Sequence, residues 1–184
     1  MRVIAGTARS LPLKTLEGLQ TRPTQDRVKE TLFNMIHQGM QGCIFVDLFS
    51  GSGAIGIEAL SRGASHAYFV ESNHKACDII KENLAFTKLM QQATVKNQEV
   101  LSAISTIIET QVDYIYLDPP YLEGVEVKVL EQLQNTSYVT SKTVIIIEAS
   151  KETDFSYITK LGYRITKEKQ YRTNKHIFMK LSYS

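Results

Sequence analysis

Residues 43–56 read CIFVDLFSGSGAIG, and this stretch decides the fold. The apolar run at 43–49 is typical of a parallel strand that is buried on both faces. Gly51, Gly53 and Gly56 follow with GxGxxG spacing. Glycine permits a tight turn and lets the backbone come close to a ligand. The stretch therefore predicts a strand, a ligand-binding loop and a helix in succession.

Strand and helix patterns alternate after this stretch. Strands are predicted at 66–71, 94–97, 112–118 and 142–150, and helices at 53–63, 74–89, 100–109 and 123–134. Residues 163–183 read as two strands around a polar turn, which predicts a final antiparallel hairpin. The expected fold is α/β and Rossmann-like, with a mostly parallel seven-stranded sheet, an antiparallel C-terminal hairpin and helices on both faces.

In open sheets of this kind, a ligand lies at the carboxyl ends of the strands. The chemistry is therefore expected just after Phe49, Val70 and Leu117.

An N-terminal extension precedes the alternation. Residues 1–20 predict a short β-hairpin. Thr24 or Asp26 is a candidate N-cap for a helix. The apolar residues of this helix fall at helical spacing: Val28, Leu32, Met35 and Ile36. We expect one domain over residues 1–184, with an extension at 1–40 and a core at 41–184.

The composition excludes several classes of protein. A chain of 184 residues suits a single core, and its 43% hydrophobic and 22% charged content is that of a globular protein. No apolar run approaches the roughly 20 residues of a membrane-spanning helix, and the start does not read as a secretory signal. Cys43 and Cys77 lack metal-ligand spacing and are expected to be buried thiols in a reducing cytoplasm.

Positive charge is concentrated at the two ends of the chain. Residues 1–40 hold six Lys or Arg against three acids, and residues 160–184 hold seven against one. Basic ends around an acidic centre are typical of a protein that contacts a polyanion. A merely solvated charged surface explains the same pattern equally well.

The glycine loop alone fits two cofactors. With Glu71 about 20 residues downstream, it resembles a dinucleotide site. However, Asp47 precedes the glycines, and its carboxylate would repel a pyrophosphate. The carboxylate suits a cationic amino group such as that of S-adenosylmethionine, which we therefore prefer.

Residues from three strand ends are candidates for binding this cofactor. Glu71 can accept hydrogen bonds from both ribose hydroxyls. Asn97, Gln98 or Glu99, helped by the backbone N–H of Val100, can recognise the adenine. The full set of predicted cofactor contacts is Asp47, Phe49, Gly51, Gly53, Glu71, Ser72, Gln98, Glu99, Val100, Asp118 and Thr24.

The tetrapeptide Asp118, Pro119, Pro120, Tyr121 follows the predicted strand at 112–118 directly. Two prolines make the turn rigid and fix the direction of its carbonyls. An aromatic amino nitrogen is a poor nucleophile, because its lone pair is delocalised. Acceptors from the Asp118 carboxylate and a proline carbonyl would favour a pyramidal nitrogen, and Tyr121 can stack on the base. We expect these four residues to be catalytic.

A capped Pro-Pro turn without chemical meaning is the alternative for this tetrapeptide. Because this chain also carries the glycine loop at 47–56, we favour the catalytic interpretation. The two motifs together are specific for amino-group methyltransferases.

Five segments resemble the RsmD family, bacterial methyltransferases of a guanine N2 in small-subunit ribosomal RNA. They occur in the family's order, at residues 2–6, 22–34, 47–64, 69–71 and 118–121. RPTQDRVKETLFN at 22–34 is the most discriminating of them. The family often has Phe where this chain has Tyr121, and its third-strand loop often has Asp or Asn.

The resemblance implies a class I enzyme that uses S-adenosylmethionine to methylate 16S rRNA. It implies that residues 1–40 contact RNA and cofactor. The implied partner is 16S rRNA, free or within an assembling 30S subunit, and the protein is expected to be a cytoplasmic monomer without a metal. The residues expected to contact RNA are Arg2, Arg9, Arg22, Arg27 and Arg172. Lys167, Lys169 and Lys175 are further candidates in the terminal hairpin, whereas His176 is expected to be a surface residue rather than a catalyst.

Three other functions share features with this sequence. An adenine-N6 or protein-glutamine methyltransferase shares the tetrapeptide, but the segment at 22–34 favours guanine N2. A non-catalytic RNA-binding module and a nicotinamide oxidoreductase fit single features only.

Overall fold

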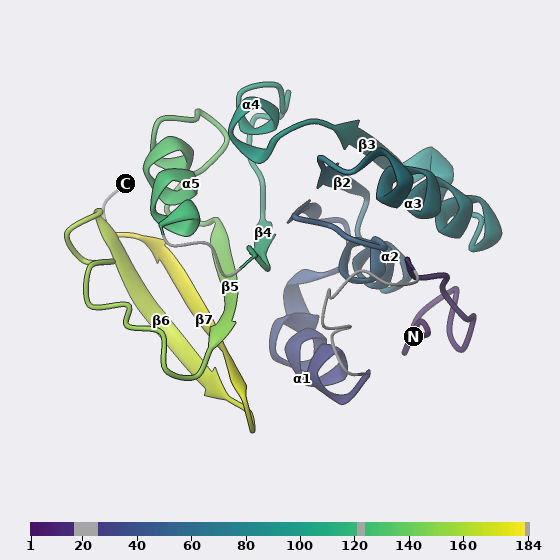
Figure 1. The fold of residues 1–184 in the computed structure, drawn as a ribbon, viewed down its shortest axis with the longest axis horizontal. Coiled ribbons are helices and arrows are strands. Elements are labelled where there is room, and N and C mark those ends of the chain that lie inside the picture. The colour runs from purple at the N-terminus through teal and green to yellow at the C-terminus, as the bar shows by residue number, and fades with distance from the viewer. Residues whose placement is uncertain (17–25, 121–123, 183–184) are drawn as a thin grey trace.

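A computed structural model describes residues 1–16, 26–120 and 124–182 (Figure 1). The helices are α1 (Asp26–Ile36), α2 (Ala54–Ser61), α3 (His74–Phe86), α4 (Val100–Ile104) and α5 (Val125–Gln134), with 3-10 turns at His37–Gly39 and Met90–Gln92. The strands are β1 (Ile44–Leu48), β2 (His66–Glu71), β3 (Ala93–Asn97), β4 (Tyr114–Leu117), β5 (Val144–Ser150), β6 (Tyr163–Gln170) and β7 (Asn174–Leu181).

The seven strands form one sheet in the order β3-β2-β1-β4-β5-β7-β6. Neighbours are parallel from β3 to β5, whereas β7 is antiparallel to both β5 and β6. The chain moves outward from β1 through β2 to β3, then returns to β4 on the other side of β1. The predicted sheet is therefore confirmed, and its topological switch point lies between β1 and β4.

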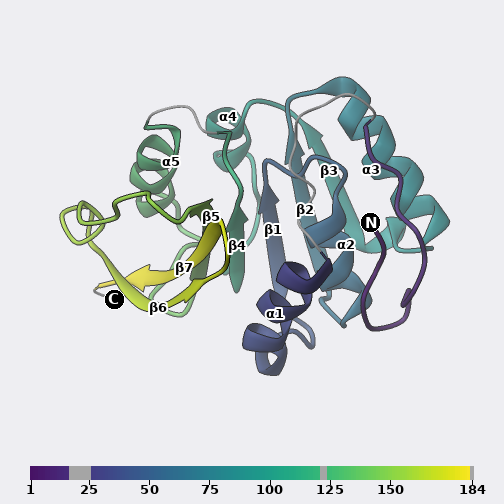
Figure 2. The ribbon, with the colours of Figure 1, turned by 60° about the horizontal axis from the view of Figure 1, so that its bottom comes forward.

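Two hydrophobic clusters cover the two faces of the sheet. Side chains of α1, α2 and α3 pack with Phe45, Phe69 and Tyr116 on one face. Side chains of α4 and α5 pack with Val46 and Leu117 on the other. Figure 2 shows these helices on opposite sides of the strands. Since both faces are covered, the central strands read as continuous apolar runs.

The N-terminal segment has less strand pairing than a β-hairpin at 1–20 would have. One antiparallel bridge joins Arg2 to Pro12, and the Val3 N–H donates to the Leu11 carbonyl at 3.0 Å. The segment instead docks on α2, where Glu58 accepts hydrogen bonds from the N–H groups of Ile4 and Ala5. Its position therefore depends on tertiary contacts.

The helices predicted at 53–63, 74–89 and 123–134 are confirmed with slightly shorter bounds, whereas the helix after β3 is much shorter than predicted. The helix predicted at 100–109 ends at Ile104, and Thr106 Oγ1 donates to the Ala103 carbonyl at 2.8 Å. This side-chain bond competes with continuation of the helix, and Ile108 is 89% exposed. In the described part of the chain, no helix is long and apolar enough to cross a membrane.

Candidate active site

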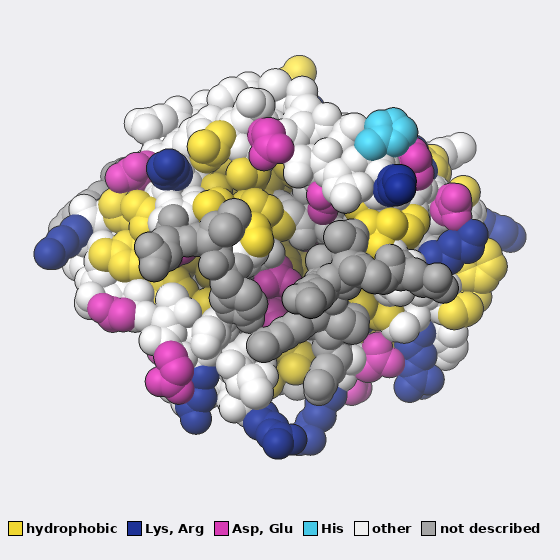
Figure 3. Space-filling model, in the orientation of Figure 1, with side chains coloured by type: hydrophobic (Ala, Val, Ile, Leu, Met, Phe, Trp, Pro, Cys, Tyr) yellow, Lys and Arg dark blue, Asp and Glu magenta, His cyan; other side chains and the backbone are white. Residues whose placement is uncertain are grey.

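The carboxyl ends of β1, β2, β4 and β5 meet at one edge of the sheet, beside the switch point. Figure 3 shows acidic side chains recessed at the centre of one face of the molecule, and hydrophobic side chains lie on the same face. Such a concave edge is where an open α/β sheet binds its ligand.

The glycine loop between β1 and α2 has left-handed backbone at Phe49, Gly51 and Gly53, with φ of 63°, 54° and 77°. A Cβ on Gly51 would meet nothing within 4 Å, whereas a Cβ on Gly56 would lie 2.4 Å from the Phe69 ring. The glycines thus have different roles. Gly51 leaves open space in which a ligand can approach the backbone, and Gly56 permits the packing of α2 on β2.

Asp47 is 1% exposed, and its Oδ2 accepts a hydrogen bond from the Gly56 N–H at 3.0 Å. Burial, together with the carboxylates of Asp118 and Glu71, raises the pKa of Asp47 to about 8. Among the described residues, no basic side chain lies within 4.0 Å of it. A buried carboxyl with acidic neighbours and no cation beside it fits a positively charged ligand.

Glu71 connects the glycine loop to the end of β2. Its two carboxylate oxygens accept hydrogen bonds from the N–H groups of Gly51 and Asn73, each at 2.9 Å. The Asn97 amide donates to the backbone carbonyls of Glu71 and Ser72 at 3.1 and 2.9 Å. Asn97 therefore stabilises the loop between β2 and α3.

A small cleft lies beside these loops, and all but one of its lining residues are predicted cofactor contacts. It is lined by Phe49, Val70, Glu71, Ser72, Gln98, Glu99 and Val100. Of the three candidates after β3, Gln98 and Glu99 line the cleft, whereas the Asn97 amide bonds to backbone carbonyls.

The Pro-Pro turn follows β4. Asp118 and Pro119 are partly buried and Pro120 is exposed. Burial and the neighbouring Glu148 carboxylate raise the pKa of Asp118 to about 7. Tyr121, Arg22 and Thr24 lie outside the described residues, so their predicted roles remain predictions.

Sequence reasoning missed Glu148 on β5. Its carboxylate accepts hydrogen bonds from Tyr116 and Asn174 at 2.5 Å each, and lies 3.1 Å from His176 Nε2. The signal was present, because an acid near the carboxyl end of the strand next to Asp118 belongs to the same edge. The expectation that His176 lies on the surface was wrong. His176 has no solvent exposure, because it pairs with Glu148 in the sheet interior.

The predicted RNA contacts in the described segments are solvent-exposed: Arg2, Arg9, Arg27 and Arg172. Lys175 is not available to RNA, since it is 9% exposed and lies over the Phe155 ring and 3.9 Å from Glu168. Figure 3 shows Lys and Arg side chains projecting at its lower edge, where α1 and the end of the β6–β7 hairpin lie in Figure 1.

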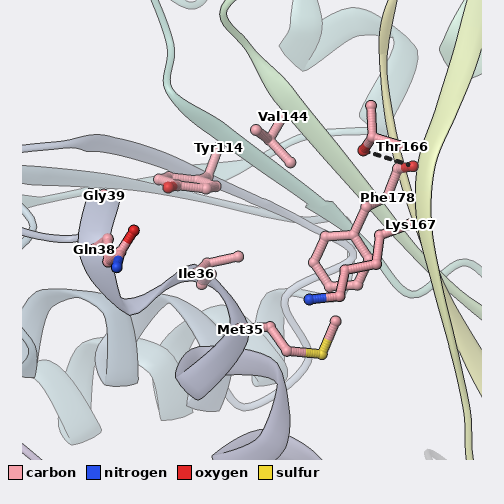
Figure 4. Close-up of a pocket in the computed structure, with 9 residues that line it drawn as sticks. All are labelled: Met35, Ile36, Gln38, Gly39, Tyr114, Val144, Thr166, Lys167 and Phe178. Atoms are coloured by element: carbon pink, nitrogen blue, oxygen red, sulfur yellow. Dashed lines mark hydrogen bonds between the residues drawn. The ribbon is translucent and has the colours of Figure 1, made fainter.

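A separate cavity of about 290 Å³ lies at the opposite edge of the sheet (Figure 4). Tyr114 and Val144, which begin β4 and β5, line it, and Met35 faces Phe178 and Lys167 across it. Among the described residues its lining contains no acid, and its titratable side chains are Tyr114 and Lys167. This cavity lies where β4 and β5 begin and is therefore remote from the acidic edge.

Comparisons with known proteins identify relatives of this chain. The family model described as Conserved hypothetical protein 95 matches residues 1–180. The putative rRNA methyltransferase YlbH of Bacillus subtilis is 37% identical over 156 residues, 84% of this chain and 85% of that protein. The ribosomal RNA small subunit methyltransferase D of Haemophilus influenzae is 35% identical over 173 residues, 92% of this chain and 88% of that protein.

Solved structures identify relatives as well. The putative methyltransferase yhhF of Escherichia coli superposes with a TM-score of 0.84 at 26% identity, covering 100% of this chain and 99% of that one. The fold is that of class I methyltransferases, as predicted. The chain belongs to the family described as Conserved hypothetical protein 95, which is the RsmD family that its sequence motifs resemble.

Proposed function

We propose that this protein transfers a methyl group from S-adenosylmethionine to the exocyclic N2 of a guanine in 16S rRNA. One observation carries the proposal. The Asp47 carboxyl is buried without a cation beside it among the described residues, and the Asp118 carboxyl of the Pro-Pro turn is close enough to raise the pKa of Asp47. A site for a cationic donor thus adjoins acceptors for an amino group. The printed names of the relatives, which are rRNA methyltransferases, support the same reaction.

The residues present fit this cofactor. S-adenosylmethionine carries a sulfonium and an ammonium group and supplies an electrophilic methyl carbon. Asp47 would hold the ammonium group, and Glu71 would accept from the ribose hydroxyls through its remaining lone pairs. Gln98 and Glu99 line the cleft where the adenine would lie. Gly51 offers open space for a close approach to the backbone.

The Pro-Pro turn would orient the target. The guanine amino group would donate one hydrogen bond to the Asp118 carboxylate and one to a proline carbonyl. These bonds would direct the nitrogen lone pair away from the turn. Transfer would form a bond from the guanine nitrogen to the methyl carbon and break the bond from that carbon to the sulfonium sulfur, leaving neutral S-adenosylhomocysteine. The methylated nitrogen would then have to lose one proton. Asp118 would take this proton and later release it to water. Tyr121 would stack on the base.

Exposed arginines would position the RNA. Arg2, Arg9, Arg27 and Arg172, with Arg22 from the segment at 22–34, would bind phosphates, which fix register without reading sequence. We propose that the substrate is 16S rRNA, free or in an assembling 30S particle, and that the enzyme acts as a cytoplasmic monomer without a metal.

A labelling experiment tests this function. The protein is incubated with methyl-labelled cofactor and with naked 16S rRNA, assembling 30S particles or DNA, and the products are digested to nucleosides. Label in N2-methylguanosine is the expected result. Label in N6-methyladenosine would overturn the guanine assignment. Asp118→Ala serves as the control and should lower kcat by about 100-fold or more.

A further inference from the structure

We propose that Glu148 is a positioning residue for methyl transfer: held by side chains from β4 and β7, it keeps Asp118 an effective proton acceptor at the catalytic turn. The inference rests on the proposed function and assigns a role to residues outside the sequence motifs. We call Tyr116, Glu148, Tyr171, Asn174 and His176 the Glu148 network.

The sheet brings Asp118 and Glu148 together. Leu117, the last residue of β4, pairs with Ile147 of β5 in parallel register. Asp118, the first residue after β4, and Glu148 of β5 directly follow this pair, and their charges interact. Side chains two residues apart along a strand share a face, so Asp118 is expected on the face of Tyr116, and Glu148 lies on that of Ile146. Tyr116 and Ile146 both pack with α1, α2 and α3. Two carboxyls thus lie side by side on one face of the sheet, where like charges repel.

The network holds Glu148 in its ionised form. His176 is its direct partner across the β5–β7 pair. An ionised carboxylate only accepts hydrogen bonds, so His176 Nε2 carries a hydrogen and donates it, while Nδ1 faces the Tyr171 hydroxyl at 3.1 Å. Tyr116 and Asn174 donate as well, at 2.5 Å each. Burial alone would raise the pKa of Glu148, but His176, Tyr116 and Asn174 hold that pKa below its usual value.

The charge on Glu148 therefore acts on Asp118. Burial and this charge raise the pKa of Asp118 to about 7. A proton acceptor works best when its pKa lies near the working pH. In the described segments, the other titratable groups that face this pair are Asp47 on β1, Tyr116 on β4, Tyr171 between β6 and β7, and His176 on β7. None of them is a cation that pairs with Asp118 within 4.0 Å in the described segments.

Glu148 is a poor candidate for binding the base directly. Both of its oxygens already accept hydrogen bonds from protein groups, and its side chain is 12% exposed. Its effect on the reaction would pass through Asp118, which distinguishes a positioning residue from a catalytic one.

The test measures the titration of Asp118 itself. Protein with ¹³C-labelled aspartate carboxyls is titrated by NMR, and the Asp118 signal is identified by its absence in Asp118→Asn. In Glu148→Gln, the midpoint of Asp118 should fall by about one pH unit. In Glu152→Gln, which removes an exposed carboxylate just after β5, it should stay unchanged. An unchanged midpoint in Glu148→Gln would overturn the inference.

A second readout links the network to the reaction. In wild type, kcat/KM should rise with pH through about 7, as Asp118 ionises. In Glu148→Gln this rise should move to lower pH, together with a lower maximum, whereas a purely structural role would lower the maximum without moving the rise. The NMR titration needs no substrate. Failure to methylate rRNA would therefore refute the proposed function and leave the coupling between Glu148 and Asp118 standing.

Discussion

Lys29 Nζ lies 3.3 Å from Glu58 Oε2, and neither side chain is exposed to solvent. The same ammonium group donates to the Arg2 carbonyl at 2.6 Å, and Arg62 Nε donates to Glu58 at 2.7 Å. One buried carboxylate thus joins the N-terminal segment, α1 and α2. Because its side chain is buried, Lys29 is not available to bind RNA.

Replacing Glu58 by Ala should destabilise the protein by about 3–5 kcal/mol, because it leaves a buried charge unpaired and the N–H groups of Ile4 and Ala5 without their acceptor. Urea unfolding measures this loss. The control is Glu82→Ala, which breaks an exposed pair with Lys14 and should cost less than about 1 kcal/mol. Equal losses in the two variants would contradict a structural role for the buried pair.

Asp47 should make the protein less stable at alkaline pH. Its pKa is about 8 in the folded protein, against roughly 3.9 in an unfolded chain. The folded state therefore favours the protonated form, and this contribution is complete below about pH 4 and lost as the pH rises through about 8. Asp47→Asn, which has no such titration, should be more stable than wild type at pH 9. Melting temperatures measured from pH 5 to 9 would show whether the advantage of the variant shrinks toward acid pH, as expected.

Cofactor binding should release a proton near pH 7. Asp47 is then mainly protonated, and a cationic amino group beside it would favour ionisation. Calorimetry in two buffers of different ionisation enthalpy measures the proton released. Asp47→Asn should abolish the release and weaken binding by about 10- to 100-fold, as expected for one charge-assisted hydrogen bond. Binding without proton release in wild type would place the ammonium group elsewhere.

Two glycines of one loop should respond differently to alanine. Gly56→Ala would force a methyl group to 2.4 Å from the Phe69 ring, so it should cost about 1–3 kcal/mol of stability. Gly51→Ala meets no atom, so it should cost only about 1–2 kcal/mol for left-handed backbone but should weaken cofactor binding. Thermal melts and calorimetry on both variants separate the effects. Unaltered cofactor affinity in Gly51→Ala would remove this loop from the binding site.

Arg172 should bind RNA through phosphate alone. Arg172→Ala should weaken binding about equally for all sequences and reduce the slope of log affinity against log salt by about 1. Lys175→Met is the matched control, since Lys175 is buried in the same hairpin beside Glu168. Filter binding at several salt concentrations measures both slopes. A reduced slope for Lys175→Met would show that Lys175 reaches the RNA after all.

The glycine loop and the Pro-Pro turn could be predicted because short stretches of sequence specify them. The glycine spacing at 51–56, the acids at the ends of apolar runs and the Pro-Pro turn each lie within a few residues of sequence. Buried parallel strands and tight turns have local signatures, so the alternation and the acidic edge could be predicted. The cofactor and RNA residues remain predictions, although most of the predicted cofactor contacts line one cleft.

The amino-acid sequence by itself determined the α/β class, the family and the acidic edge of the sheet at which chemistry is expected. The tertiary structure alone decided which side chains meet. His176 joins Glu148 across 28 residues because β7 inserts between β5 and β6, and Lys29 meets Glu58 because α1 and α2 cover the same face. Strand order and helix packing arise from the global burial of apolar surface, and no local pattern encodes them.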